Sequence, residues 1–251
     1  MKMRLLEAHS GLSALVVERS LFDGIWVSSL THSASKGLPD NEIVSLGERV
    51  SLVQEIRRVT TKPIVVDIDT GGAIEHISFY VKWFEQVGAS MLIMEDKRFP
   101  KQNSLLHEGK HQMEEVDTFC QKIKAAKSAA VGVKIIARLE SLIAKRSMYE
   151  ALLRADAYID AGADGIVIHS KKEVSASEVM EFSEKFRMKH KDIMLVAIPT
   201  TYILPNEHPF DVVIYANHLL RASLKAMQET AREIDQKNMV SVSDIFSLLG
   251  H

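Results

Sequence analysis

Short apolar runs rich in β-branched residues alternate along the chain with longer segments in which apolar residues recur every three or four positions. The first pattern indicates buried parallel strands, and the second indicates the amphipathic helices that connect such strands. Eight runs predict strands, at residues 4–8, 24–28, 63–69, 90–96, 134–140, 165–170, 193–199 and 212–218. Helices are expected between them, among others at residues 45–60, 73–87, 148–161 and 176–190. Eight strand and helix pairs in 251 residues predict an α/β fold, a closed parallel (β/α)8 barrel of the TIM type.

Composition narrows the class of protein. No Pro-rich or Ser-rich linker and no low-complexity tract interrupts the pattern, so we expect residues 1–251 to form one domain. The formal net charge is −2, and Lys and Arg are spread along the chain, which predicts no nucleic-acid partner and no membrane-surface binding. No stretch has signal-peptide or membrane-span character. Cys120 is the only cysteine, so we expect a soluble cytoplasmic protein in which this thiol is packed and inert.

Polar residues follow several predicted strands, in "DID", "EDK", "ARLE", "HSKK" and "ANH". The carboxyl ends of barrel strands meet at one mouth, which is the active-site face of such barrels. Asp67 and Asp69 are expected on one face of their strand, with Glu95 at the end of the neighbouring strand. Carboxylates this close repel one another unless a cation lies among them. With no cysteine here and the nearest histidine, His76, in the following helix, an all-oxygen site favours Mg²⁺, with Mn²⁺ as a substitute, over a solvated acidic rim.

Two loops beside the predicted mouth are suited to an anionic ligand. The segment at residues 95–110 is long and basic and contains Pro100 and Gly109, which suits a mobile cover, although a plain surface loop would read the same way. Ser28 and Ser29 follow the second strand, and their backbone N–H groups could meet a carboxylate or an oxyanion.

Three further side chains end predicted strands. Arg138 can bind a phosphoryl group through paired donors, or it can form a structural salt bridge with Glu140. His169 and His218 could donate to a ligand, although a histidine packed in the core is the alternative for each.

The segments "EAHSGLSALVVE", "DIDTG", "MEDKRFPKQNS", "IARLES", "IVIHSKK" and "YANHLLRAS", in this order, resemble the phosphoenolpyruvate mutase family of the isocitrate lyase superfamily. The resemblance runs from about residue 4 to about residue 248. It implies a magnesium-dependent enzyme of phosphonate biosynthesis that acts on a small phosphorylated 2-oxo acid. In the mutase reaction the phosphoryl group of phosphoenolpyruvate moves from the enol oxygen to the methylene carbon, which gives phosphonopyruvate. Such a loose transfer needs positioning and charge stabilisation more than a strong nucleophile.

The resemblance also implies a metal set at the mouth of the barrel. Asp67 matches the direct ligand of Mg²⁺, and Asp69 and Glu95 match residues that act largely through water.

The remaining matches concern the substrate. Trp26 matches a wall of the pocket, and the backbones of Ser28 and Ser29 match the groups that receive the substrate carboxylate. Asp40 matches an acid near the transferring group, which favours an orienting role and leaves nucleophilic attack as the alternative. The other matches are Lys101, Asn103 and Ser104 of the gating loop, and Arg138 and His169 at the phosphoryl end.

The chain departs from the family in "GAIEH" after "DIDTG", where related mutases have a stretch richer in Gly and Asn, and it ends at "SVSDIFSLLGH", where relatives commonly continue with another polar helix. Relatives exchange a C-terminal helix between subunits, so the resemblance implies a homodimer or homotetramer with a swapped helix.

Other activities of the superfamily remain as alternatives. Phosphonopyruvate hydrolase shares the fold, the metal and most ligands, but Asn103 favours the mutase because the hydrolase pattern resembles Thr at that place. The isocitrate and methylisocitrate lyases need a cysteine in the gating loop, which reads "FPKQNS" here. A 2-oxo acid decarboxylase or lyase, and a non-catalytic barrel that binds a small acid, also remain.

Overall fold

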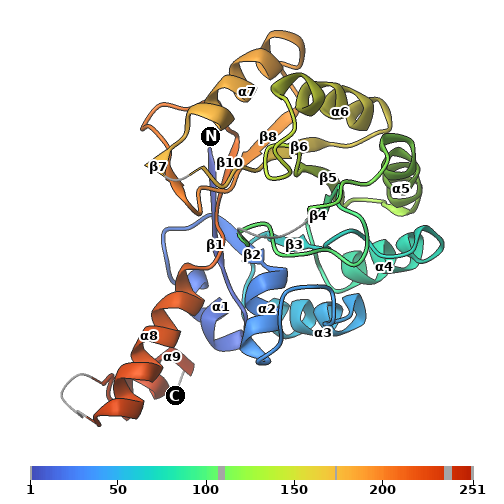
Figure 1. Cartoon of the computed structure of the whole chain (residues 1–251). Coiled ribbons are helices and arrows are strands. Elements are labelled where there is room, and N and C mark those ends of the chain that lie inside the picture. Colours follow the sequence, from blue (N-terminus) through green and yellow to red (C-terminus); the bar gives the residue numbers. More distant parts are fainter. Residues whose placement is uncertain (1, 107–110, 173, 235–238, 250–251) are drawn as a thin grey trace.

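The predicted strands form because their apolar runs can be buried on both faces of a sheet that helices cover. The computed structural model describes residues 2–106, 111–172, 174–234 and 239–249. Eight parallel strands close in the order β1-β10-β8-β6-β5-β4-β3-β2 (Figure 1), which confirms the predicted barrel. The strands are β1 (Met3–Glu7), β2 (Gly24–Val27), β3 (Ile64–Asp67), β4 (Met91–Glu95), β5 (Lys134–Leu139), β6 (Gly165–Ile168), β8 (Met194–Ala197) and β10 (Val212–Tyr215). β7 (Val174–Ser175) and β9 (Tyr202–Ile203) form a separate parallel pair.

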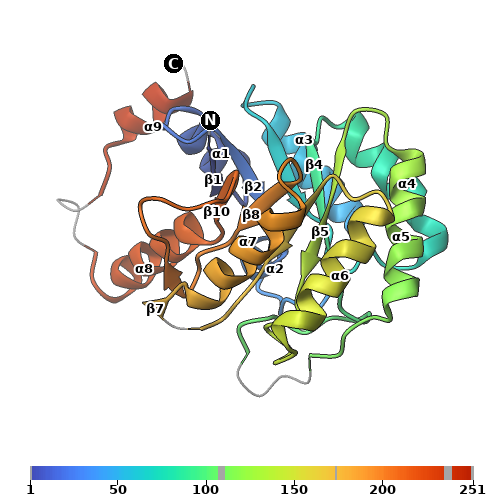
Figure 2. The same cartoon turned by 90° about the horizontal axis from the view of Figure 1, so that it is seen from above.

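Helices surround the barrel, with α4, α5 and α6 together on one side (Figure 2). The helices are α1 (Gly11–Glu18), α2 (Ser29–Ser35), α3 (Leu46–Arg57), α4 (Ile74–Gln86), α5 (Val116–Ala129), α6 (Met148–Asp160), α7 (Ser177–Lys189), α8 (His218–Arg232) and α9 (Val242–Leu249). The four predicted helices are confirmed as α3, α4, α6 and α7, each slightly shorter than expected. The start of α3 is fixed locally, because Ser45 and Glu48 form a reciprocal capping box.

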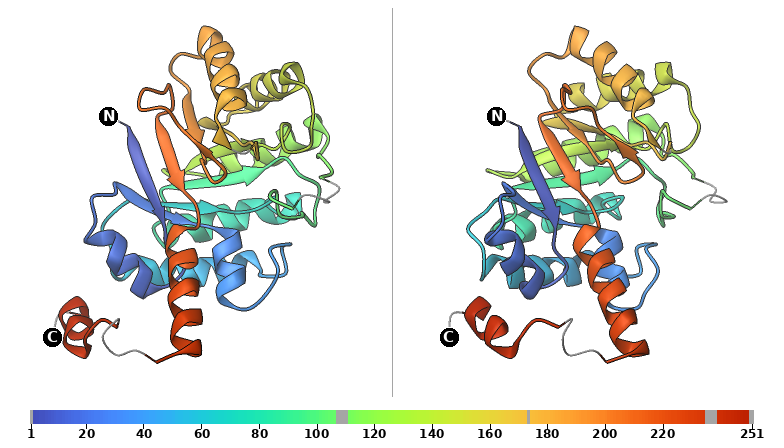
Figure 3. Two further views of the ribbon diagram at one scale, coloured as in Figure 1. Left: turned by 60° about the vertical axis from the view of Figure 1, so that its left-hand side comes forward. Right: turned by 90° about the vertical axis from the view of Figure 1, so that its left-hand side faces the viewer.

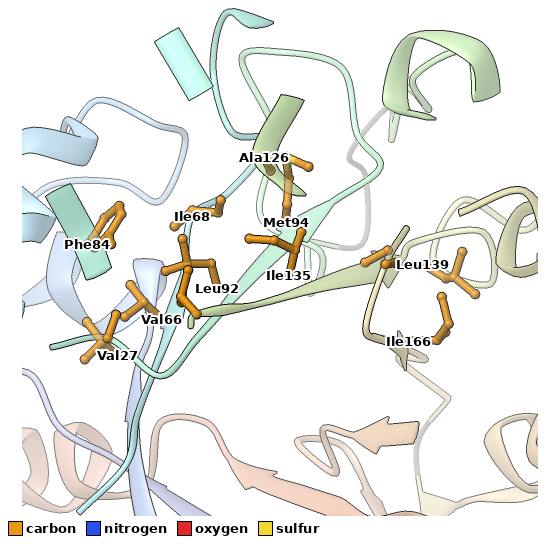
Figure 4. Packing of buried hydrophobic residues seen from close by; sticks show 14 of the residues in the cluster. Val27, Val66, Ile68, Phe84, Leu92, Met94, Ala126, Ile135, Leu139 and Ile166 are labelled. Atoms are coloured by element: carbon orange, nitrogen blue, oxygen red, sulfur yellow. The ribbon is translucent and has the colours of Figure 1, made fainter. Parts of the chain in front are cut away.

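Side chains alternate along each strand between two apolar layers. One layer fills the barrel interior with Leu5, Trp26, Val65, Met91, Ile93, Ile136, Val167, Val196, Ile198, Val212 and Ile214. The other lies between the strands and the helices, where Val66, Leu92 and Ile135 of the barrel belong to the same cluster as Phe84 and Ala126 of the helices (Figure 4). The period of two therefore decides which strand residues face the barrel axis.

The lone thiol of Cys120 lies on α5, half-buried and packed against the outer apolar layer. Its Sγ donates to the carbonyl oxygen of Ala157 at 3.5 Å, and burial raises the pKa of the thiol. Both observations agree with the prediction of a packed Cys120 that is not activated.

The last two described helices do not join the ring around the barrel. α8 and α9 contain no buried side chain, and Figure 3 shows them projecting from the barrel. Leu224 and Met227 of α8 are half or more exposed. Among the described residues, no helix is long and apolar enough to cross a membrane. The cytoplasmic location and the single domain stay predictions.

Candidate active site

Because side chains alternate along each strand, charged and polar side chains lie at the carboxyl end of the barrel. The inward apolar residues Val65, Ile93, Ile136 and Val167 are each followed two positions later by a polar residue, respectively Asp67, Glu95, Arg138 and His169. All four of these polar side chains are buried. The same period of two that fills the interior thus places two acids, a guanidinium and an imidazole at one mouth.

A cavity of about 40 Å³ lies at this mouth. Ten predicted site residues line it: Trp26, Ser28, Ser29, Asp40, Asp67, Lys101, Asn103, Ser104, Arg138 and His169. Leu30, Leu105, Ile198, Thr200, Ala216 and Asn217 complete the wall. Of these, the polar Thr200 and Asn217 were not predicted, although Asn217 belongs to the "ANH" motif. Asp69 and Glu95 are buried nearby but do not line the cavity.

The prediction that His218 could donate to a ligand in this site is wrong. The eighth strand was expected to reach His218, but β10 ends at Tyr215 and α8 begins at His218. The turn into the helix carries the imidazole to a different cavity, and Asn217 lines the mouth instead.

The ammonium group of Lys101 lies among three carboxylates. Its Nζ is 2.8 Å from Asp69 Oδ1, 3.3 Å from Asp40 Oδ1 and 3.7 Å from Glu95 Oε1. It also donates to Ser29 Oγ at 2.9 Å, and Ser29 Oγ donates to Asp67 Oδ2 at 3.0 Å. Burial alone would lower the pKa of Lys101, but the surrounding carboxylates hold it well above its usual value. The lysine therefore stays charged inside the protein.

Asp69 does not continue the strand face of Asp67, which corrects the prediction. β3 ends at Asp67, and Asp69 has a φ of 52°, so strand alternation has already stopped. Its Oδ2 accepts a hydrogen bond of 2.5 Å from Arg49, which also donates to the carbonyl oxygen of Asp67 at 2.8 Å. Against the effect of burial, Arg49 and Lys101 keep the pKa of Asp69 below its usual value.

The sequence analysis missed Arg49, which is fully buried on α3. The sequence feature that could have indicated it is a charged residue on the apolar face of a predicted helix, the face that also contains Leu52 and Val53. A charge at such a position needs a buried partner.

Glu140 joins Arg138 and His169 to the segment at residues 97–106. Its Oε1 accepts from Arg138 Nε at 2.6 Å and lies 2.8 Å from His169 Nδ1. Its Oε2 accepts from Ser104 Oγ at 2.6 Å and lies 3.1 Å from Lys97 Nζ. Against the effect of burial, Arg138 and Lys97 hold the pKa of Glu140 well below its usual value. The sequence predicted Glu140 only as a possible structural partner of Arg138. The structure confirms that ion pair and adds contacts of Glu140 with His169, Ser104 and Lys97.

Arg138 is held in place by this partner and still faces the cavity. Its guanidinium nitrogens lie 3.6 Å from Asp67 Oδ2 and 3.6 Å from Glu95 Oε2. Burial and the charge of Arg138 lower the pKa of His169, so its imidazole is neutral near pH 7. This part of the cavity thus offers one fixed planar cation and one imidazole whose pKa is lowered.

Residues 97–106, here called the lid, cover the cavity with Asn103, Ser104 and Leu105. Asn103 Nδ2 donates to Asp40 Oδ2 at 2.6 Å, and Asn103 Oδ1 accepts from the amide of Leu105 at 2.9 Å. The side-chain amide of Asn103 therefore binds the protein through both its donor and its acceptor. His107 and Gly109, which belonged to the predicted cover, lie outside the described residues.

The oxygens of Glu95 test whether the site suits a metal ion. Both are buried without a hydrogen-bond partner, and the nearest cation atoms lie between 3.6 and 4.0 Å away. Burial raises the pKa of Glu95 to about 7, against the opposing charges of Lys101 and Lys97. Over the described residues, no three acidic, His or Cys side chains converge to hold an ion alone. The oxygen donors suit Mg²⁺, which usually keeps several waters in its shell.

The chain is similar in sequence to known proteins. The family described as phosphoenolpyruvate phosphomutase matches residues 2–235. The phosphoenolpyruvate phosphomutase of Tetrahymena pyriformis is 37% identical over 95% of this chain and 81% of its own length. The phosphonopyruvate hydrolase of Variovorax sp. (strain Pal2) is 35% identical over 98% of this chain and 89% of its own. The 2-methylisocitrate lyase of Bacillus subtilis is 32% identical over 88% of this chain and 73% of its own.

Solved structures show the same likeness. The phosphoenolpyruvate phosphomutase from Streptomyces platensis subsp. rosaceus aligns with a TM-score of 0.92 and 34% identity over 100% of this chain and 91% of its own. A phosphonopyruvate hydrolase in complex with oxalate and Mg²⁺ aligns with a TM-score of 0.87 and 32% identity over 99% of this chain and 90% of its own.

Substitutions of Arg49 and Asp69 test whether these two buried charges stabilise the fold only as a pair. We expect Arg49→Met to lower the free energy of unfolding by about 3 to 5 kcal/mol, because it removes one partner of a buried ion pair. Asp69→Asn should cost a similar amount, and the double variant should cost clearly less than the sum. Urea unfolding at one protein concentration measures all three.

The control is Lys185→Met, which removes a charge from an exposed pair with Glu181 and should cost less than about 1 kcal/mol. If the two buried substitutions add to within about 0.5 kcal/mol, Arg49 and Asp69 do not depend on one another.

Proposed function

Because this chain belongs to the phosphoenolpyruvate phosphomutase family, we propose that it interconverts phosphoenolpyruvate and phosphonopyruvate. In this reaction the P–O bond to the enol oxygen breaks, and the methylene carbon of the resulting pyruvate enolate supplies the electron pair for a new P–C bond. No group enters or leaves, so the protein's task is to hold two fragments while one turns relative to the other.

The observation that carries the proposal is the small covered cavity into which two buried cations, Lys101 and Arg138, both face. The planar guanidinium of Arg138, fixed by Glu140, suits the oxygens of a phosphoryl group in flight. His169 lies beside Arg138 and is positioned for the same end of the ligand. Trp26 of β2 would wall the pocket, and the backbones of Ser28 and Ser29 at the start of α2 would receive the carboxylate end.

The carboxylate cluster is the proposed site for Mg²⁺, with Mn²⁺ as a substitute. Asp67 lines the cavity and would bind the ion directly, whereas Asp69 and Glu95, which do not line it, would act through water. The ion would supply charge stabilisation for the carboxylate and enolate oxygens of the substrate. Lys101 balances the acids from the lid side.

Phosphonopyruvate hydrolysis is the second candidate, because the hydrolase relative matches nearly as much of this chain with nearly the same identity as the mutases. The two reactions differ in whether water or the enolate carbon captures the phosphoryl group. Lyase chemistry is disfavoured, because the only cysteine of the chain lies on α5 and not on the lid.

Phosphorus NMR of phosphonopyruvate with the protein and Mg²⁺ tests the proposal. We expect the signal of phosphoenolpyruvate to appear, and we expect no conversion when a chelator removes the metal. Accumulation of inorganic phosphate alone would make the hydrolase reading correct. A protein that leaves phosphonopyruvate unchanged would overturn both.

The hydrogen bond between Asn103 and Asp40 allows a test of whether the lid keeps water out of the cavity. Asn103→Ala removes the side chain that ties the lid to Asp40, so water should reach the phosphoryl group more often. We expect most mutase activity to be lost and the share of substrate released as phosphate to rise. Gln54→Ala, which also removes a side-chain amide but at an exposed position on α3, is the matched control. Interconversion at the parent rate would count against a sealing role for Asn103.

We also propose a homodimer or homotetramer in which α8 of one copy covers the barrel of another. In a (β/α)8 barrel a helix normally covers the outer face of each strand. The outer face of β1 and β10, at Arg4, Val213 and Tyr215, instead lines a cavity of about 730 Å³. α8 meanwhile leaves Leu224 and Met227 exposed.

Light scattering coupled to size exclusion tests this assembly. We expect the parent protein to be at least a dimer at micromolar concentration and the pair of substitutions Leu224→Glu and Met227→Glu to shift it toward monomer. Leu21→Glu, at an exposed position outside α8, should leave the mass unchanged. A monomeric parent would contradict the exchange of α8.

A further inference from the structure

Glu42 joins three segments that meet beside the active site. It lies between α2 and α3, in the same segment as Asp40. Its Oε2 accepts from the backbone amide of Lys101 at 2.7 Å, which fastens the lid. Its Oε1 accepts from Thr70 Oγ1 at 2.7 Å and from the Thr70 amide at 3.1 Å, which fastens the loop that follows Asp69. A single carboxylate thus ties the lid to the loop behind the metal-site acids.

The charge of Glu42 has no cationic partner within ion-pair distance among the residues that the structure describes. The carboxylate is largely buried, and burial and the charge of Asp69 raise the pKa of Glu42. Backbone and hydroxyl donors therefore stabilise it, and these donors belong to the elements that it joins. Such an arrangement fixes geometry more than it contributes net attraction, because the donors come from two segments, the lid and the loop that follows Asp69.

The backbone also indicates a constrained position. Glu42 has a φ of 63°, in the left-handed region that side chains other than glycine rarely adopt. The surrounding contacts must hold the residue there, since an unconstrained Glu would relax to a negative φ.

Asp40 and Glu42 act on the same lid residue from one segment. Asp40 meets the side chains of Lys101 and Asn103, whereas Glu42 holds the backbone of Lys101. The position of the Lys101 backbone decides how far its ammonium reaches into the carboxylates. We propose that Glu42 is a positioning residue that holds the lid in its closed place over the cavity, a role that rests on the proposed phosphoryl transfer for its functional consequence.

Glu42→Gln tests this role with almost no change in size. A glutamine side chain has one oxygen and one NH₂ group, so it can accept from Thr70 or from Lys101, but it presents a donor to the other. Loss of a hydrogen bond to a charged acceptor should increase opening of the lid by about tenfold or more. Hydrogen–deuterium exchange of peptides from the lid, followed by mass spectrometry with Mg²⁺ and oxalate present, measures this opening without turnover.

The kinetic expectation is specific to a positioning role. In Glu42→Gln the kcat for phosphonopyruvate should fall about tenfold with little change in KM, and the share released as phosphate should rise. Glu42→Asp keeps the charge with a shorter reach and should recover part of both effects. If Glu42→Gln does not fold, Glu42→Asp carries the exchange measurement by itself.

Glu75→Gln is the matched control, because it makes the same chemical change at an exposed position on α4. It should leave exchange of the lid and turnover at the parent values. Parent-like exchange of the lid in the Glu42 variants would overturn the clamp, whatever their turnover. A parent protein that produces neither phosphoenolpyruvate nor phosphate would overturn the proposed function instead, and the exchange result would still decide the role of Glu42.

Discussion

The interaction on which the mouth of this barrel depends is the pairing of buried carboxylates with buried cations. Asp69 could not remain ionised in an apolar interior without nearby positive charge, and the same cations oppose the rise that burial causes in the pKa of Glu95. Arg49 approaches Asp69 from the helix layer, Lys101 comes from the lid and Arg138 comes from a neighbouring strand. Each cation arrives from a different structural element, so the charge balance is complete only when helix, lid and barrel are all in place. Folding of the barrel and closure of the lid are coupled through these charges.

The sequence predicts the parts of the site that lie on strands, and it does not predict the parts that depend on contacts between elements. The period of two along strands predicts Asp67, Glu95, Arg138 and His169, because rigid strands carry a local pattern to a known end of the barrel. It fails at Asp69, two residues after the end of β3, where a positive φ breaks the alternation. It fails again at His218, where a helix begins earlier than the apolar run suggested.

The sequence predicts several site residues but not the side chains that form ion pairs and hydrogen bonds with them. Arg49 reaches Asp69 across 20 positions of sequence, and Glu140 gathers groups from the lid and from β5. Such pairings depend on tertiary distances that no local pattern encodes. The likeness to mutases places Asn103 in the gating loop, but it does not predict that the Asn103 amide binds the protein through both its donor and its acceptor. Contacts of this kind decide whether a lid seals, and sealing is what distinguishes transfer to carbon from transfer to water.

The outward position of α8 bears on how the stability of this protein would depend on its concentration. In the proposed assembly α8 of a second copy covers the outer face of β1 and β10, so the barrel would have part of its apolar burial outside its own chain. Its free energy of folding then includes an association step, so it depends on concentration. Dilution would lower the melting temperature of the barrel, although every active-site residue described above comes from a single chain.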